Sequence, residues 1–219
     1  IAFTAANTFA SCTGIATLNL PASLKSFHYH SQTFANDTAF KTITLGEGNK
    51  IFSLVDNVLY NKDKTELIAY PAANSRTSYT IPGSVKSIGS CAFSACFNLR
   101  EISVPFVGRQ RSPINERESF FGYIFGESFY DCAYKAKQYG EISANAVTYY
   151  LPTSLVSVAI TDAQTIAAGA FRGCESIVSL SLPPCLVDVG KCAFYECYGL
   201  KEVHIDDLSA WCGRAGYEC

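Results

Sequence analysis

The sequence has no methionine, a single tryptophan and only three histidines among its 219 residues. Charged side chains make up 16% of the chain, well below the roughly 25% of ordinary soluble proteins. The 17 Lys and Arg residues nearly balance the 19 Asp and Glu residues, so no strong field would attract a nucleic acid. We therefore expect no nucleic-acid partner. The missing initiator Met suggests a processed chain or an excised fragment.

Long hydrophobic runs are also missing. No stretch of the sequence approaches the roughly 20 consecutive apolar residues that cross a bilayer, so we expect no membrane insertion in this segment. Hydroxyl side chains, 22 Ser and 15 Thr, supply much of the polar surface in place of charge. The surface is therefore expected to be neutral and rich in hydrogen-bonding groups.

Motifs for catalysis are absent as well. The chain has no Gly-x-Ser-x-Gly, no His-Glu-x-x-His and no phosphate-binding loop, since Gly46-Glu47-Gly48 lacks both the following glycine and the expected helix. The carboxylates between residues 116 and 131 share that segment with arginines, which favours solvated ion pairs over an acid and base pair. We expect no enzyme activity, no catalytic residue and no cofactor.

One phrase recurs along the chain: an Ala-Phe or Thr-Phe pair, a Cys three positions after the Phe, and then spaced apolar residues. Copies start at Thr8, Ala92, Ala170 and Ala193, and a degenerate copy has Asp37 in the Cys position. The closest copies lie just over twenty residues apart, a period typical of leucine-rich-repeat solenoids. We count about five repeats.

Each copy ends in a pair of apolar residues that alternate with polar neighbours, as in a short strand with one buried face. These pairs are Leu18/Leu20, Ile43/Leu45, Ile102/Val104, Leu180/Leu182 and Val203/Ile205. No copy can bury its apolar face alone, so neighbouring copies must stack. We predict a strand-rich, α/β-type repeat solenoid over residues 1–219. It is a right-handed coil with short parallel strands on one wall and turns or helical turns elsewhere.

A second phrase links the copies. Residues 81–102 read Ile-Pro-x-Ser-Val-x-x-Ile-Gly-x-x-Ala-Phe-x-x-Cys-x-x-Leu-x-x-Ile, and Leu182 to Ile205 follow the same order with Pro184-Cys185 in place of the small pair. The sequence thus resembles the BspA-type leucine-rich repeats of bacterial surface proteins. Residues 203–212 also resemble a segment that follows such repeats in members from gut bacteria. The resemblance implies a secreted or surface-attached module, for which adhesion to host matrix proteins and to other cells has been described.

Two segments depart from the repeat and are interpreted as insertions. In the first, at about residues 47–79, Asn57 to Pro71 reads as a hairpin of two apolar strands around Asn-Lys-Asp-Lys. The second, at about residues 106–150, is rich in arginine and aromatic residues. Insertions in solenoids map to loops on one face, often the binding face.

The ten cysteines do not predict a metal site. Cys91-x4-Cys96 and Cys192-x4-Cys197 occupy equivalent repeat positions and cannot converge on one ion. Cysteines in the Ala-Phe-x-x-Cys position are expected to be packing residues. Free thiols are the default for Cys91, Cys132, Cys185, Cys192, Cys212 and Cys219, although Cys185 and Cys192 could face each other across one turn. His28 and His30 are interpreted as surface residues, because His204 lies far along the coil.

The candidate binding residues fall into two groups. The first lies at the outward positions of the predicted strands: Thr17, Asn19, Thr42, Thr44, Glu101, Ser103, Ser179, Ser181, Glu202 and His204. The second lies in the long insertion: Arg109, Arg111, Arg117, Phe120, Phe121 and Tyr123. The strand positions form a hydroxyl-rich face that suits hydrogen bonding to a backbone or a glycan more than charge steering.

These observations favour a non-catalytic, extracellular protein-interaction or adhesion module of a bacterial surface protein. The expected partner is a host matrix or cell-surface protein, with a glycan as a further candidate. The alternative is a structural spacer that presents another domain of a larger surface protein or enzyme. The hydroxyl-rich face is also consistent with a surface that is merely solvated.

Overall fold

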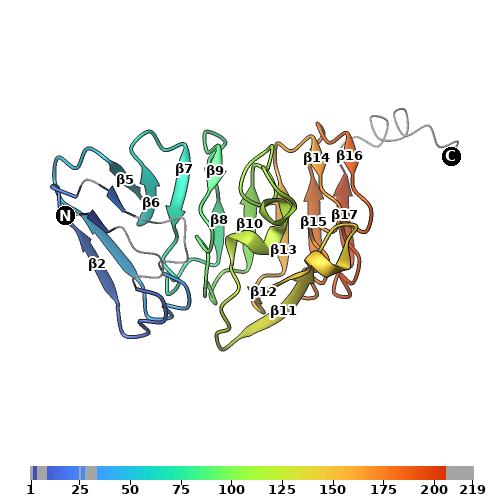
Figure 1. Ribbon diagram of the computed structural model, residues 1–219, viewed down its shortest axis with the longest axis horizontal. Helices are drawn as coiled ribbons and strands as arrows, with labels where there is room; N and C mark the ends of the chain where they lie inside the picture. The colour runs from blue at the N-terminus through green and yellow to red at the C-terminus, as the bar shows by residue number, and fades with distance from the viewer. Residues whose placement is uncertain (1, 4–8, 25, 28–33, 206–219) are drawn as a thin grey trace, which may run out of the picture.

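The computed structural model describes residues 2–3, 9–24, 26–27 and 34–205, and the statements below concern these residues. Short strands follow one another along an extended coil, with the first repeats at one end of the molecule and β17 near the other (Figure 1). The predicted strand-rich solenoid is confirmed, and its right-handedness stays a prediction. The α/β label is not confirmed, because the described residues contain no α-helix. Their helices are the 3-10 segments η1 (Glu116–Ser119), η2 (Phe121–Ile124) and η3 (Ser143–Asn145).

Parallel strands form one long wall of the coil, which we call the front wall. A first pair joins β2 (Thr17–Leu20) to β4 (Thr42–Leu45). A five-stranded sheet continues the wall in the order β17-β15-β13-β10-β8. Its strands are β8 (Ser78–Thr80), β10 (Glu101–Val104), β13 (Ser157–Ile160), β15 (Ser179–Leu182) and β17 (Glu202–Ile205). The predicted alternation holds in β10 and β15, where Ile102, Val104, Leu180 and Leu182 are buried, but not in β17, where Val203 is 47% exposed.

Two strands of the front wall, β8 and β13, were not among the predicted strands. The spacing Leu155-x-x-Val158-x-Ile160 matches that of Leu99-x-x-Ile102-x-Val104, but no Ala-Phe-x-x-Cys phrase precedes it. In β8 the inward position is Tyr79, an aromatic residue where the other copies have an aliphatic one. The spacing of the apolar residues therefore predicts a strand more reliably than the full repeat phrase does.

A second wall consists of shorter strands that precede the Ala-Phe pairs: β9 (Ser87–Ile88), β14 (Thr165–Ile166) and β16 (Asp188–Val189). β14 pairs with β16 in parallel, and β9 pairs in parallel with β7 (Glu66–Ala69). Near the N-terminus, β1 (Ala2–Phe3) pairs with β3 (Ser26–Phe27). The coil thus has hydrogen-bonded strands on two sides.

The hairpin predicted at Asn57 to Pro71 is present, but it is not a surface loop. β5 (Phe52–Val55), β6 (Val58–Asn61) and β7 form consecutive antiparallel pairs. Alternate residues of β6 and β7 belong to different cores: Val58 and Leu67 to a large one, Leu59 and Ile68 to a smaller one. Burial on both faces explains the nearly continuous apolar run of this segment. The hairpin separates two hydrophobic cores.

The long segment at residues 106–150 also differs from the expectation, because much of it belongs to the core. The Phe121 ring stacks on Phe171 with centroids 4.7 Å apart, and Phe125 lies 6.3 Å from Phe93. The amide of Cys91 donates to the Tyr123 carbonyl at 3.1 Å. Residues 118–125 therefore fill one layer of the coil in place of an Ala-Phe-x-x-Cys copy. Two parts lie outside this layer: the excursion at residues 111–117 and the hairpin of β11 (Ala133–Gln138) and β12 (Val147–Pro152).

A buried arginine fixes the β11–β12 hairpin to the coil. The Arg172 guanidinium lies 3.9 Å from the centre of the Tyr139 ring and 4.6 Å from that of Tyr195. Its Nη1 donates to the Tyr139 hydroxyl at 3.0 Å, and its buried Nε has no hydrogen-bond partner among the described residues. No sequence pattern indicated this contact.

Three cysteines of the repeat phrase, Cys96, Cys174 and Cys197, are packing residues, as predicted, whereas Cys12 is only partly buried and belongs to none of the hydrophobic clusters. Cys96 and Cys174 are 1% and 0% exposed, and Cys197 donates to the Phe171 carbonyl at 3.1 Å. All eight described cysteines are free thiols. The pairing of Cys185 with Cys192 is not formed, because the Cys185 thiol instead donates to the Ala163 carbonyl at 3.5 Å. Cys212, Cys219, His28 and His30 lie outside the described residues.

Candidate interaction site

The outward side chains of the front wall form two rows, because strand register aligns equivalent residues of each copy. One row consists of Ser78, Glu101, Ser157, Ser179 and Glu202, and the other of Thr80, Ser103, Ala159, Ser181 and His204. In the separate β2–β4 pair, Thr17 aligns with Thr42 and Asn19 with Thr44. Of the ten strand positions predicted from the sequence, six lie in these two rows and four in the β2–β4 pair. The structure adds Ser78, Thr80, Ser157 and Ala159.

The rows form a regular, weakly charged grid. Neighbouring strands lie about 4.8 Å apart and outward residues recur at every second position. Glu101, Glu202 and His204 are the charged or titratable members of the rows. His204 Nε2 lies 3.5 Å from Glu202 Oε2. The Thr44 hydroxyl donates to Asn19 within its pair. The grid thus offers hydroxyl groups for hydrogen bonds and little charge for steering.

The front wall is interrupted between β4 and β8, where no backbone pairing joins the two sheets among the described strands. The Asn57 side chain covers the edge of β4: its Oδ1 accepts from the Ile43 amide at 2.8 Å and its Nδ2 donates to the Lys41 carbonyl at 2.7 Å. An exposed ion pair of Asp56 and Arg76, 3.8 Å apart, lies beside this break. The five-stranded sheet is therefore the larger continuous surface.

The aromatic residues predicted to bind from the long segment do not form a surface. Phe120 and Phe121 are both 0% exposed and belong to the large core, so the prediction that they contact a partner is wrong. Tyr123 is half-buried and packs against the same core, and its burial raises its pKa. The sequence does not show that these aromatic residues are buried, because no Ala-Phe-x-x-Cys phrase marks the coil layer that they complete.

The three arginines of the segment are each paired with a carboxylate. Arg109 Nη1 lies 2.7 Å from Glu118 Oε1, and Arg117 pairs with Glu127. Arg111 reaches Asp162, which follows β13, at 2.5 Å. The structure therefore does not bring these residues together into a basic patch.

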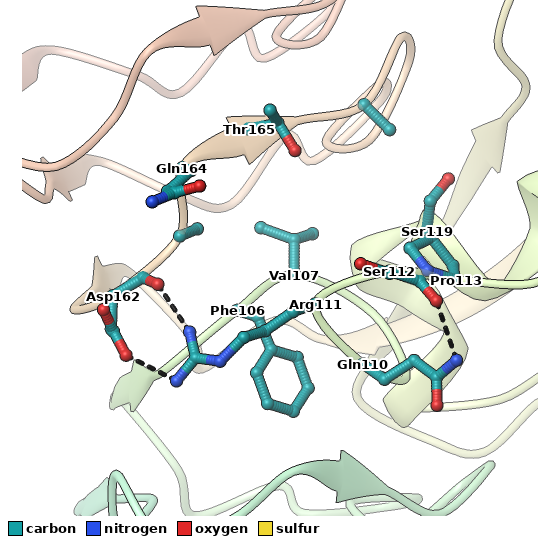
Figure 2. Close-up of a pocket in the computed structure, with 12 residues that line it drawn as sticks. Phe106, Val107, Gln110, Arg111, Ser112, Pro113, Ser119, Asp162, Gln164 and Thr165 are labelled. Atoms are coloured by element: carbon teal, nitrogen blue, oxygen red, sulfur yellow. Dashed lines mark hydrogen bonds and ion pairs between the residues drawn. The ribbon is translucent and has the colours of Figure 1, made fainter.

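Arg111 instead lines a cleft in the second wall, with a volume of about 530 Å³ (Figure 2). Its guanidinium donates to both the carboxylate and the carbonyl of Asp162 and lies 5.6 Å from the centre of the Phe106 ring. Figure 2 shows Gln164 and Thr165 across the cleft from Arg111. We call this cleft the second-wall cleft. The residues that line it are Phe106, Val107, Gln110, Arg111, Ser112, Pro113, Ser119, Asp162, Ala163, Gln164, Thr165 and Ala167.

The cleft arises because one strand of the second wall is missing. Ser87 of β9 forms an antiparallel bridge with Gln110, and the Ile88 amide donates to the Arg109 carbonyl at 2.8 Å. The chain then leaves the wall for the excursion at residues 111–117. No backbone hydrogen bond among the described residues joins Gln110 to β14. Apart from Arg111, none of the residues that line the cleft was among the predicted binding residues, since no motif marks the space between two layers.

The described residues show no cluster suited to metal binding, and four of their thiols are poorly acidic. Nowhere in the described ranges do three His, Cys, Asp or Glu side chains lie together in a way that could hold a metal ion. Burial raises the pKa of the Cys91 and Cys197 thiols to about 11 and holds those of Cys96 and Cys174 well above their usual range. Nucleophilic thiolate is therefore scarce at these four positions at neutral pH. No helix within the described ranges is long and apolar enough to span a membrane.

Comparison with known proteins agrees with the repeat pattern. The family described as "BspA type Leucine rich repeat region" matches residues 3–76, 69–107 and 141–215, with six copies. A leucine-rich cell-surface protein from Faecalibacterium prausnitzii shares the fold at 20% identity, with a TM-score of 0.51 over 94% of the chain. The pneumococcal vaccine antigen PcpA aligns at 28% identity, with a TM-score of 0.50 over 89% of the chain. The chain spans only 52% and 40% of these two structures. Comparison with curated protein sequences gives no match.

Proposed function

Because the chain belongs to the BspA-type leucine-rich repeat family, we propose that it is a non-catalytic protein-interaction module of a bacterial surface protein. The segment acts outside the cell, where it contributes to adhesion by binding a protein of a host or of a neighbouring cell. The similarity to a cell-surface protein of the same fold and to a pneumococcal antigen supports this location.

The two aligned rows of the front wall carry this proposal. Five strands present outward side chains in one register, and most of these side chains are neutral hydrogen-bonding groups. Such a surface can pair with backbone and side-chain groups of a partner over several strands. Specificity then depends on hydrogen-bond geometry, with Glu101, Glu202 and His204 adding local charge.

Charge added at the middle of the front wall tests this proposal. The double variant Ser179→Arg/Ser181→Arg places two bulky cations on β15, at positions that face solvent between β13 and β17. Binding to immobilised fibronectin and type I collagen, as representative matrix proteins, is measured by surface plasmon resonance. We expect the variant to bind at least about tenfold more weakly, a loss of about 1.4 kcal/mol.

A matched control adds the same charge elsewhere. Ser84 and Ser143 are exposed and lie outside the front-wall strands, so Ser84→Arg/Ser143→Arg should bind like the wild type. Equal weakening in both variants would show a general charge effect and would contradict a front-wall site. Unchanged binding in both would favour the spacer role.

Replacing residues 106–150 with a short linker does not test the binding role. That change would remove Phe120, Phe121 and Tyr149 from the large core, and each is at most 1% exposed. Loss of binding would then report unfolding, because loss of a single buried aromatic side chain already costs about 3–5 kcal/mol. Point substitutions on the wall avoid this problem.

A further inference from the structure

We propose that the second-wall cleft binds an extended, uncharged peptide segment of a protein partner, which adds as a strand along the free edge of β14. This inference rests on the proposed role in protein recognition, but it assigns a separate site on another wall of the coil.

The first observation is the open edge of β14. On one side, the carbonyls of Gln164 and Ile166 accept from the amides of Asp188 and Gly190, at 3.2 and 2.7 Å. Backbone groups of successive strand residues point to opposite edges. The Thr165 amide and carbonyl therefore point away from β16, and Thr165 lines the cleft. An unpaired strand edge is a template for another extended chain.

The second observation is that a strand occupies the corresponding second-wall position in the neighbouring layers. β9 and β14 occupy the same place in their repeats, before Phe93 and Phe171, and each pairs with a strand of an adjacent layer. The layer between them holds Gln110 against β9 and leaves the β14 side open. A strand in the cleft would restore the hydrogen-bonding pattern that the excursion at residues 111–117 interrupts.

The third observation concerns charge and polarity. The cleft contains one cation and one anion, Arg111 and Asp162, and they neutralise each other. An uncharged segment is complementary to such a lining, whereas a charged one would compete with the existing pair. Phe106, Val107 and Ala163 line the cleft and are buried, so the inward side chain of the bound segment should be small and apolar. Gln110, Ser112 and Gln164 supply polar contacts at the rim.

A peptide titration tests this assignment. The probe is an acetylated and amidated peptide with the sequence of residues 163–169, Ala-Gln-Thr-Ile-Ala-Ala-Gly, an uncharged second-wall strand. We expect saturable NMR shifts at the amides of Thr165, Ile166 and Ala167 of the full chain. Hydrogen exchange at the Thr165 amide should slow at least about tenfold. The same peptide with alternate N-methylated residues lacks the required donors and should not bind.

Two variants that fill the cleft make the result independent of one substitution. Thr165→Trp and Ser112→Trp place a large ring at exposed rim positions and should each weaken peptide binding at least about tenfold. Thr80→Trp puts the same ring on an exposed threonine of the front wall and should leave peptide binding unchanged. Binding of matrix proteins to the front wall should survive Thr165→Trp, which separates this proposal from the proposed function.

Three results would overturn the assignment. One is the absence of saturable shifts at β14. Another is equal binding of the N-methylated peptide, which would remove the strand-pairing mechanism. The third is a response of the same amides to cellotetraose but not to the peptide, which would assign the cleft to a neutral saccharide.

Discussion

At the residue scale, Asp37 is the position where the chain departs most clearly from its own repeat. It replaces the cysteine of the phrase, is 1% exposed, and accepts the Cys12 amide on Oδ1 at 2.7 Å. Its Oδ2 has no hydrogen-bond partner within the described residues. Burial raises its pKa from 3.8 to about 6, and the hydrogen bond from Cys12 opposes that shift only in part. The folded chain therefore holds a poorly solvated carboxylate at neutral pH.

Protonation of Asp37 couples the stability of the fold to pH. Between the unfolded pKa of 3.8 and the folded value near 6, the folded state binds more protons at Asp37 than the unfolded state does. Its contribution therefore makes the fold more stable as the pH falls through this window. Asp37→Asn removes the charge and retains an acceptor for Cys12. We expect it to raise the free energy of unfolding by about 1–3 kcal/mol at about pH 7.5.

Urea unfolding at two pH values checks this prediction. At about pH 4, where Asp37 is mostly protonated in the folded state, the gain from Asp37→Asn should nearly vanish. Asp63→Asn, at an exposed position between β6 and β7, serves as the control and should change stability little at either pH. A gain that does not depend on pH would show that the carboxylate is not the cause.

At the scale of the repeat element, the copies share a backbone conformation that their sequences do not indicate. The residue before the Cys position is left-handed in all five Phe-x-x-Cys or Phe-x-x-Asp copies, although its identity varies. These residues are Ser11 (φ 60°), Asn36 (φ 63°), Ala95 (φ 57°), Gly173 (φ 69°) and Glu196 (φ 61°). Only Gly173 adopts this conformation without a steric cost. The geometry of the turn is thus imposed by stacking rather than by local preference.

Glu196→Gly should therefore stabilise the protein. A left-handed conformation costs a residue with Cβ about 1–2 kcal/mol, and the greater freedom of glycine in the unfolded chain offsets part of this. We expect a net gain of about 0.5–1 kcal/mol in thermal or urea unfolding. Glu175→Gly, at an exposed glutamate outside the left-handed set, should instead destabilise by about 0.5–1 kcal/mol. A loss of stability in both variants would contradict the proposed strain.

The elements also show what the sequence can and cannot predict. Apolar residues at alternate positions, such as Ile102 and Val104, predicted the strands, because few elements other than a strand bury every second side chain. The layer built from Phe121 and Phe125 was missed, since no Ala-Phe-x-x-Cys spacing marks it. The front-wall rows followed from the strand positions. The second-wall cleft did not follow from the strand positions. It exists because two segments that are far apart in the sequence form no backbone hydrogen bond with each other.

At the scale of the whole molecule, the two larger of the three hydrophobic clusters among the described residues lie in succession along the coil. The smaller contains Leu18, Phe40 and Ile43, and the larger extends from Val58 to Ala193. The β6–β7 hairpin contributes to both. In a solenoid each layer contacts mainly its neighbours, so stability is nearly a sum of local terms. The two cores should therefore respond separately to damage.

Ile43→Ala tests this separation. Ile43 is 2% exposed in the smaller core, and such truncations cost about 2–5 kcal/mol. We expect faster amide hydrogen exchange at residues 17–24 and 42–55, measured by mass spectrometry, with little change at residues 157–205. Val158→Ala in the larger core should give the converse pattern around β10 and β15. A uniform increase along the chain in either variant would show one cooperative unit instead.

The buried thiols of the repeat have a consequence for the environments in which this fold can exist. Cys96 and Cys174 are enclosed by neighbouring layers and hold their protons, so an oxidant meets neither an accessible sulfur nor a thiolate. Their packing does not depend on a covalent link between sulfurs. These layers can therefore pass from a reducing compartment to an oxidising one without a chemical change in their interior. Among the described thiols, the one that is exposed to solvent is Cys132.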